Sequence, residues 1–162
     1  MRMIFCWVGK TQKEPIKTLI SEYLGRLRHL APVETVEVPD MSRRRGLLGA
    51  SLVAAEAAEI VKVLAPGCKK IVLDERGEQF SSLDFARWLE TEQIRGTRRV
   101  AFIIGGPEGM DDALLNGAHL RLSLGKMTWT HEMARVLLLE QAYRALCILR
   151  NIPYHKAAGG RK

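Results

Sequence analysis

The chain has 162 residues, of which 47% are hydrophobic and 27% are charged, and this length suits one folded domain. A chain of this size buries enough surface to fold without disulfides or a structural metal. The composition excludes collagen-like, disordered and disulfide-scaffold proteins. No apolar run reaches the length of about 20 residues that a transmembrane helix needs, and the apolar run at 3–8 is too short for a signal peptide.

Charge and cysteine content narrow the class further. Residues 117–162 hold 8 Lys and Arg against 2 Asp and Glu, whereas residues 67–116 hold 7 against 9. This basic C-terminal third favours a polyanionic partner, although a basic protein without such a partner fits the charge too. Cys6, Cys68 and Cys147 are scattered and form no CxxC pair, so neither a zinc site nor a disulfide framework is indicated. We expect a reduced, cytoplasmic protein.

Strand-like and helix-like segments alternate along the chain. Short apolar runs predict strands, and apolar residues spaced three and four apart predict amphipathic helices. The predicted strands are 3–8, 33–38, 69–74, 99–104 and 119–124. The predicted helices are 13–30, 47–64, 81 or 82 to about 94, 111–116 and 132–149. This alternation predicts a single-domain α/β fold over residues 1–162, with a parallel sheet covered on both faces.

Ligands of open parallel sheets bind beyond the carboxyl ends of the strands. Three predicted strand ends carry unusual sequences, namely DERG at 74–77, GGPEG at 105–109 and GKMTWTH at 125–131. The glycines of GGPEG allow positive φ or a close approach to a ligand, and Pro107 stiffens the turn. The segment is neither a P-loop nor a GxGxxG motif. It predicts either a ligand-binding loop or a tight strand-to-helix turn without a ligand.

Two other regions are candidates for a functional role. In the tail, Tyr154 and His155 directly follow Pro153, which is unusual for a terminus that would normally fray. The arginine run at 43–45 is either a solvated loop or a contact with phosphates. His131 is expected near the start of the last helix.

Three motifs together resemble the SPOUT-class RNA methyltransferases, and within them the RlmH family of large-subunit rRNA pseudouridine methyltransferases. They are IIGGPEG at 103–109, the segment 122–135 with its run LGKMTWTH, and the ending NxPYH at 151–155. The resemblance covers essentially the whole chain. GGPEG recurs across related SPOUT enzymes, whereas its combination with the PYH ending is much more specific.

The resemblance implies a deep trefoil knot within about residues 69–150, a homodimer, and an S-adenosylmethionine site formed by the knot loops. It implies 23S rRNA in the ribosome as partner, with no metal and no membrane. Family members often have Pro where this chain has Thr130. The residues that should contact the cofactor, carried over by motif, are Leu73, Gly105, Leu124, Gly125, Lys126, Met127, Thr128 and Trp129. They lie at the three strand ends described above.

The resemblance also implies a reaction, methylation of N3 of a pseudouridine within the assembled ribosome. The sulfonium methyl is already activated, so the protein must align donor and acceptor, and N3 must lose its proton. Because histidine suits proton transfer near neutral pH, we expect His155, or a water it holds, to assist deprotonation. Tyr154 would stack on or hydrogen-bond the base, and Arg135 or Arg150 would stabilise the developing negative charge. The tail of one subunit could complete its partner's pocket.

Two alternatives remain open. The same fold could modify another RNA position, since fold does not determine substrate. The chain could also be a ribosome-associated RNA-binding protein without catalysis, which the basic C-terminal third equally fits. A nicotinamide-dependent Rossmann enzyme is disfavoured because the fingerprint glycines are absent.

Overall fold

A computed structural model describes residues 1–42 and 46–155, so the arginine run at 43–45 lies outside the described residues, as do residues 156–162. The elements in chain order are β1 (Arg2–Val8), α1 (Glu14–Arg28), β2 (Val33–Val38), α2 (Ala50–Val63), β3 (Lys69–Gln79), α3 (Ser82–Ile94), β4 (Arg99–Ile104), α4 (Asp112–Asn116), β5 (Leu120–Ser123) and α5 (His131–Leu149). The predicted alternation of strands and helices is confirmed, and β2 and β4 have their predicted bounds.

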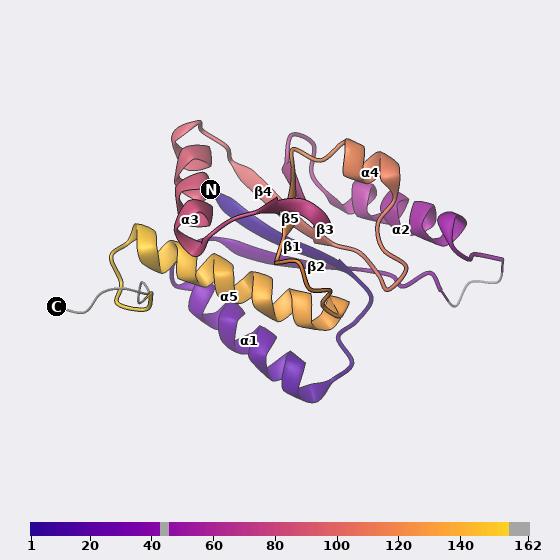
Figure 1. Cartoon of the computed structure of the whole chain (residues 1–162), viewed down its shortest axis with the longest axis horizontal. Coiled ribbons are helices and arrows are strands. Elements are labelled where there is room, and N and C mark those ends of the chain that lie inside the picture. Colours follow the sequence, from indigo (N-terminus) through magenta and orange to yellow (C-terminus); the bar gives the residue numbers. More distant parts are fainter. Residues whose placement is uncertain (43–45, 156–162) are drawn as a thin grey trace.

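The strands form one sheet in the order β2-β1-β4-β3-β5, and each neighbouring pair is parallel. Helices cover both faces, as Figure 1 shows: α1, α3 and α5 lie on one side of the sheet, and α2 and α4 lie on the other. Helix α5 packs against both α1 and α3. The predicted parallel α/β architecture is therefore confirmed.

Successive side chains of the central strands point to opposite faces of the sheet, so each apolar strand contributes to two cores. On β1, Met3, Phe5 and Trp7 join the core under α1, α3 and α5, whereas Ile4 and its alternate neighbours join the core under α2. Burial on both faces explains why β1 reads as one continuous apolar run.

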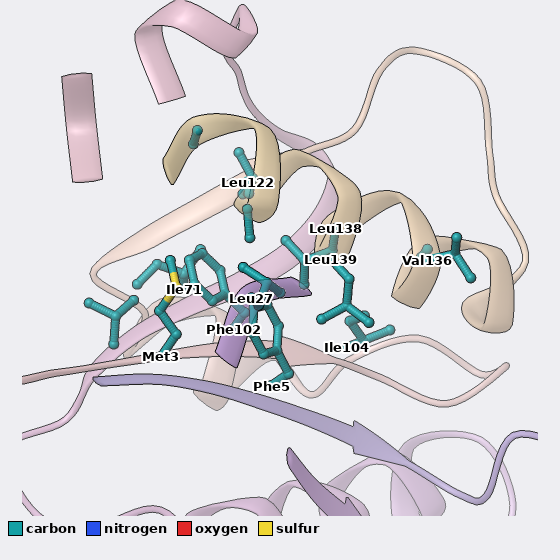
Figure 2. Packing of buried hydrophobic residues seen from close by; sticks show 14 of the residues in the cluster. Met3, Phe5, Leu27, Ile71, Phe102, Ile104, Leu122, Val136, Leu138 and Leu139 are labelled. Atoms are coloured by element: carbon teal, nitrogen blue, oxygen red, sulfur yellow. The ribbon is translucent and has the colours of Figure 1, made fainter. Parts of the chain in front are cut away.

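The larger core is centred on two stacked phenyl rings from neighbouring strands. Phe5 and Phe102 are paired in register, and their ring centroids lie 5.4 Å apart. Figure 2 shows Leu138 and Leu139 of α5 above these rings. All four side chains are almost fully buried. Helix α5 is therefore the central helix of its face, which fixes the position of the loop that precedes it.

Strand β3 differs from its prediction. Residues 74–77 are not a loop at the end of the strand, because β3 continues to Gln79. The pairing with β5 shifts between Leu73 and Glu78, both of which pair with Leu122, so the intervening residues form a bulge. A Cβ on Gly77 would lie 2.7 Å from the backbone of Arg121, so only glycine lets the two strands approach this closely.

The three cysteines are free and buried. Burial raises the pKa of the Cys6 thiol to about 12 and also raises the pKa of Cys68, so both stay protonated near neutral pH. Among the residues that the structure describes, no helix is both long and apolar enough to cross a membrane.

Candidate functional site

Strand register brings the three predicted cofactor segments together at the carboxyl edge of the sheet. Leu73 on β3 pairs with Leu122 on β5, two residues before Leu124. On its other side, β3 pairs with β4 up to Val72 and Ile103, so Leu73 directly follows the last paired residue of β3, and Ile104, which precedes Gly105, directly follows that of β4. Leu73 and Leu124, which are 51 positions apart in the sequence, are thus brought together by adjacent parallel strands. They lie at the edge where such sheets bind ligands.

The loop at 105–109 is folded tightly upon itself. The amide of Gly109 donates to the carbonyl oxygen of Gly106 at 3.1 Å, and Gly109 has a φ of 94°. A Cβ on Gly105 would lie 2.4 Å from the carbonyl oxygen of Gly109, and one on Gly106 would lie 2.9 Å from Oε2 of Glu56. Gly105 therefore tolerates no side chain in this conformation, and the backbone at the end of β4 stays bare.

The carboxylate behind this loop is itself buried. Glu56 on α2 is 3% exposed and accepts a hydrogen bond from the amide of Met41 at 3.4 Å. Burial raises the pKa of Glu56, and the nearby charges of Asp40 and Glu108 raise it further. The glycine loop is thus supported from below by α2 and by the segment that follows β2.

The third loop, which connects β5 to α5, is exposed. Lys126 is on the surface, and Met127 and Trp129 are 72% and 41% exposed. The hydroxyl of Thr128 donates to Glu75 in the β3 bulge at 3.4 Å. The loop thus contacts the first of the three segments while its apolar side chains remain available to a ligand or a partner.

A cavity of about 390 Å³ opens beside the third loop, within the size range of small-molecule sites. Leu124, Gly125 and Trp129 line it from the loop, and the start of α3 and the middle of α5 form its other walls. The hydroxyl of Ser82 on α3 donates to Gln141 on α5 at 2.8 Å beside it. The other predicted cofactor residues, Leu73, Gly105, Lys126, Met127 and Thr128, are not among its lining residues.

Arg135 occupies a different environment from the one expected for a residue at the target base. Its side chain is fully buried and donates to the carbonyl oxygen of Val8 and to the hydroxyl of Thr11, each at 2.7 Å. Its guanidinium carbon also lies 5.2 Å from the ring centroid of Trp7. Burial lowers the pKa of Arg135. Arg135 therefore holds α5 against the end of β1 and does not face a substrate in this chain.

The first turn of α5 carries three further polar residues. The hydroxyl of Thr130 accepts a hydrogen bond from the amide of Met133 at 3.3 Å, so this residue is the N-cap. Glu132 is 7% exposed and accepts from the amide of Gln12 at 2.6 Å, a bond that lowers the pKa of its carboxyl despite burial. Burial and the charge of Arg135 lower the pKa of His131.

Tyr154 and His155 pack against the far half of α5. The hydroxyl of Tyr154 donates to Glu140 at 3.1 Å and lies 3.4 Å from the hydroxyl of Tyr23 on α1. Arg144 pairs with Glu140, and its guanidinium carbon lies 4.8 Å from the ring centroid of Tyr154. The same guanidinium is 3.5 Å from Nδ1 of His155. The tail is therefore held in a defined position by this cluster, the tail clamp.

Sequence reasoning missed the residues of the tail clamp other than Tyr154 and His155. The spacing of Glu140 and Arg144 by four residues on a helix was an available sign of their ion pair. Nothing local in the sequence indicated the contribution of Tyr23, which lies 131 residues before Tyr154.

The structure does not bring the tail and the cofactor segments together within one chain. Glu140 follows His131 by nine residues, which corresponds to about 13 Å along the helix axis. Arg150 is farther along and donates to the carbonyl oxygen of Leu30, at the end of α1. Within residues 1–42 and 46–155, no group of three or more His, Cys, Asp or Glu side chains could hold a metal ion.

Comparison with known proteins gives consistent matches. Residues 1–155 match the family model described as "Predicted SPOUT methyltransferase". Proteins named ribosomal RNA large subunit methyltransferase H from Pelobacter propionicus and from Geobacter sp. (strain M21) are 41% and 40% identical over 155 residues, covering 96% of this chain and 99% of theirs. A probable methyltransferase from Bordetella pertussis Tohama I shares the fold, with a TM-score of 0.55 at 15% identity over 89% of this chain and 93% of that one. The chain belongs to the SPOUT methyltransferase family.

Proposed function

We propose that this protein transfers a methyl group from S-adenosylmethionine to N3 of a pseudouridine in the 23S rRNA of the assembled ribosome, in the cytoplasm. Membership of the SPOUT methyltransferase family and full-length relatives named as large-subunit rRNA methyltransferases support the reaction class. The observation that carries the proposal is the register of β3 with its two neighbours, which pairs Leu73 with Leu122 and Val72 with Ile103, because it gathers the three cofactor segments at one sheet edge.

The cofactor is held by Leu73, Gly105 and the loop residues from Leu124 to Trp129. The residues present fit such a ligand. Gly105 keeps the loop at 105–109 in its tight conformation, because a Cβ there would lie 2.4 Å from the carbonyl oxygen of Gly109, and the third loop exposes the apolar side chains of Met127 and Trp129. When bound, S-adenosylmethionine supplies an activated methyl group. The protein then has to align that methyl group with the acceptor nitrogen and keep water away.

Tyr154 and His155 act on the target base. His155, or a water that it holds, accepts the N3 proton, and Tyr154 stacks on the base or hydrogen-bonds to it. Burial raises the pKa of Tyr154, so its hydroxyl stays protonated as a donor. Arg135 is a positioning residue, because its fully buried guanidinium fixes the first turns of α5 and hence the loop before them. Arg150, which binds Leu30, keeps its predicted role at the developing charge only if that contact opens.

The active unit is a homodimer in which the tail of one subunit completes the cofactor pocket of its partner. The separation of about 13 Å between the tail clamp and the start of α5 supports this arrangement. Exposed apolar residues near the third loop, Met127, Trp129 and Leu83, support a subunit contact there.

Mixed dimers test this arrangement. We expect Gly105→Val and His155→Ala homodimers each to be inactive, and a mixture of the two to regain about a quarter of the normal activity, since half of the dimers carry one intact site. If both residues acted within one chain, the mixture would stay inactive.

We also propose that residues 69–150 contain the trefoil knot. Helix α5 packs between α1 and α3, although the strand before it, β5, lies at the far edge beyond β3. The chain therefore returns across the carboxyl ends of β3 and β4. Force applied to residues 69 and 150 tests the knot. When an unknotted chain is pulled taut, the distance between the two pulled residues reaches about 3.3–3.6 Å per residue. In a knotted chain this distance stays shorter, because the tightened knot retains part of the chain.

Methyl transfer to ribosomal subunits tests the reaction class. We expect label from S-adenosylmethionine in the RNA of ribosomes that lack the modification, and none in isolated small subunits. Cofactor binding without any transfer to ribosomes would move the substrate elsewhere. Absence of cofactor binding would leave an RNA-binding protein without catalysis.

A further inference from the structure

A second hollow lies at the opposite end of the sheet from the cofactor segments. Its volume is about 650 Å³, and it is lined by residues at the amino ends of β3 and β4 and by the loops before them: Pro66, Gly67, Lys69, Arg95, Gly96, Thr97, Arg98, Arg99 and His119. We call this hollow the basic basin. Its lining holds four Lys and Arg side chains and no acidic residue.

One buried carboxylate under the basin neutralises only part of this charge. Glu92 on α3 is 1% exposed, and its carboxylate binds Lys69 at 2.6 Å and Arg95 at 3.2 Å. The hydroxyl of Thr97 donates to it at 2.7 Å. Burial alone would raise the pKa of Glu92, but these donors together lower it, so the carboxylate is ionised near neutral pH. Lys69 and Arg95 are thus both held in place by the carboxylate of Glu92.

The two remaining cations of the basin have no such partner. Arg98 and Arg99 are exposed, and neither side chain forms an ion pair or hydrogen bond with the residues described. The adjacent ring of His119 accepts a hydrogen bond from the amide of Lys70 through Nδ1, at 3.1 Å. A neutral ring in that tautomer carries its proton on Nε2, where it is a donor. The basin therefore presents fixed donors and unneutralised positive charge.

We infer that the basic basin binds the phosphate backbone of RNA, as a contact separate from the cofactor site. Phosphate oxygens are the partners that Arg, Lys and His donors bind without regard to base sequence. Strand β4 has six residues and spans about 20 Å between the basin and Gly105. This inference rests on the proposed function only in taking the RNA to be the substrate. A single RNA helix or strand is long enough to reach both ends of the sheet.

Through this contact the protein binds a part of the RNA other than the target nucleotide. It makes affinity dependent on salt while leaving the chemistry at the carboxyl edge unchanged. Substitution in the basin should accordingly raise the KM for ribosomes and leave kcat and cofactor affinity unaltered.

The test compares Arg98→Ala/Arg99→Ala with Arg28→Ala/Arg87→Ala, which removes the same charge from exposed positions outside the basin. Binding of a fluorescein-labelled oligouridylate is followed by anisotropy over about 50–200 mM KCl. We expect the basin variant to bind about 10- to 30-fold more weakly at 0.1 M salt and its salt slope to fall by about 1.4, corresponding to two phosphate contacts. The control should change less than about twofold. Arg98→Lys/Arg99→Lys should restore most of the affinity.

Equal oligouridylate affinity in the basin variant and the control would overturn the inference. So would a variant that loses binding to phosphatidylglycerol vesicles while keeping its affinity for RNA, because the basin would then serve a lipid surface. Absence of methyl transfer by the unsubstituted protein is a different result. It would contradict the proposed reaction and would leave the RNA contact to be judged by the anisotropy series alone.

Discussion

The hydroxyl of Tyr154 donates to the carboxylate of Glu140 at 3.1 Å, joining the C-terminal tail to the second half of α5. Glu140 also pairs with Arg144, whose guanidinium lies over the ring of Tyr154 and near His155. The tail residues that we assign to the target base are thus held on a rigid helix, although they follow its end. Because the same helix begins at the cofactor loop, α5 sets the distance between the cofactor loop of its own chain and the tail that we assign to the partner's pocket.

Removing the imidazole of His155 should affect turnover far more than stability. We expect His155→Ala to lower kcat by about 100-fold or more, since general base catalysis typically contributes that much. The loss of its contact with Arg144, which keeps Glu140 as a partner, should leave the thermal midpoint nearly unchanged. Single-turnover methyl transfer and a thermal melt measure both quantities. Full turnover by both His155→Ala and Tyr154→Phe would exclude a chemical role for the tail.

Gly105 should be essential for cofactor binding. We expect Gly105→Val to weaken S-adenosylmethionine binding about tenfold or more, or about 1.4 kcal/mol, because its Cβ would force the loop away from the carbonyl of Gly109. Isothermal titration calorimetry measures the affinity.

Gly25→Ala is the matched control for this substitution. A Cβ on Gly25 meets no atom within 4 Å, and the residue lies inside α1. The control should keep cofactor affinity and gain about 0.5–1 kcal/mol of stability. Unchanged affinity in Gly105→Val would contradict the assignment of the loop.

We expect Arg135 to contribute to the stability of the fold and to have no direct role in methyl transfer. We expect Arg135→Met to lower the free energy of unfolding by about 2–4 kcal/mol, because the carbonyl of Val8 and the hydroxyl of Thr11 would lose a buried donor. Urea unfolding monitored by circular dichroism measures the change. A variant that kept its stability but lost turnover would instead indicate direct contact with the reacting base.

The contribution of Glu132 to the stability of the folded protein should depend on pH. Its pKa in the folded protein lies below the 4.5 of an ordinary glutamate, because the amides of Gln12 and Lys13 donate to the carboxylate. The stability it supplies is therefore fully present above pH 4.5 and is lost as the pH falls through the folded value. We expect Glu132→Gln to be less stable than the unsubstituted protein at pH 7, with a difference that shrinks toward pH 3. A constant difference across this range would contradict the assignment.

The sequence predicted elements whose burial is uniform and missed features that depend on distant contacts. Strand β4 was predicted at its observed bounds because VAFII, which follows Arg99, is a continuous apolar run whose residues are all buried. The extension of β3 through DERGEQ was missed because these polar residues have no strand period and pair with β5 only beyond a bulge. Nothing near Arg135 indicated its burial, since its partner Val8 lies 127 residues earlier.

The segments of the candidate site could be predicted from the sequence, but their arrangement in space could not. The glycine loop and the residues from Leu124 to Trp129 were recognisable because their composition is unusual at strand ends. Their convergence with Leu73 depends on the strand order β4-β3-β5, which no local pattern determines. The basic basin likewise gathers residues from separate loops that are ordinary surface charges in the sequence.

Mapping the nucleotide that receives the methyl group tests both the proposed reaction and its substrate. Ribosomes from a strain lacking the modification are incubated with the protein and methyl-labelled S-adenosylmethionine, and the large-subunit RNA is digested and analysed by mass spectrometry. We expect a single labelled nucleoside, pseudouridine carrying the methyl group at N3. Label at another nucleotide or another ring position would contradict it.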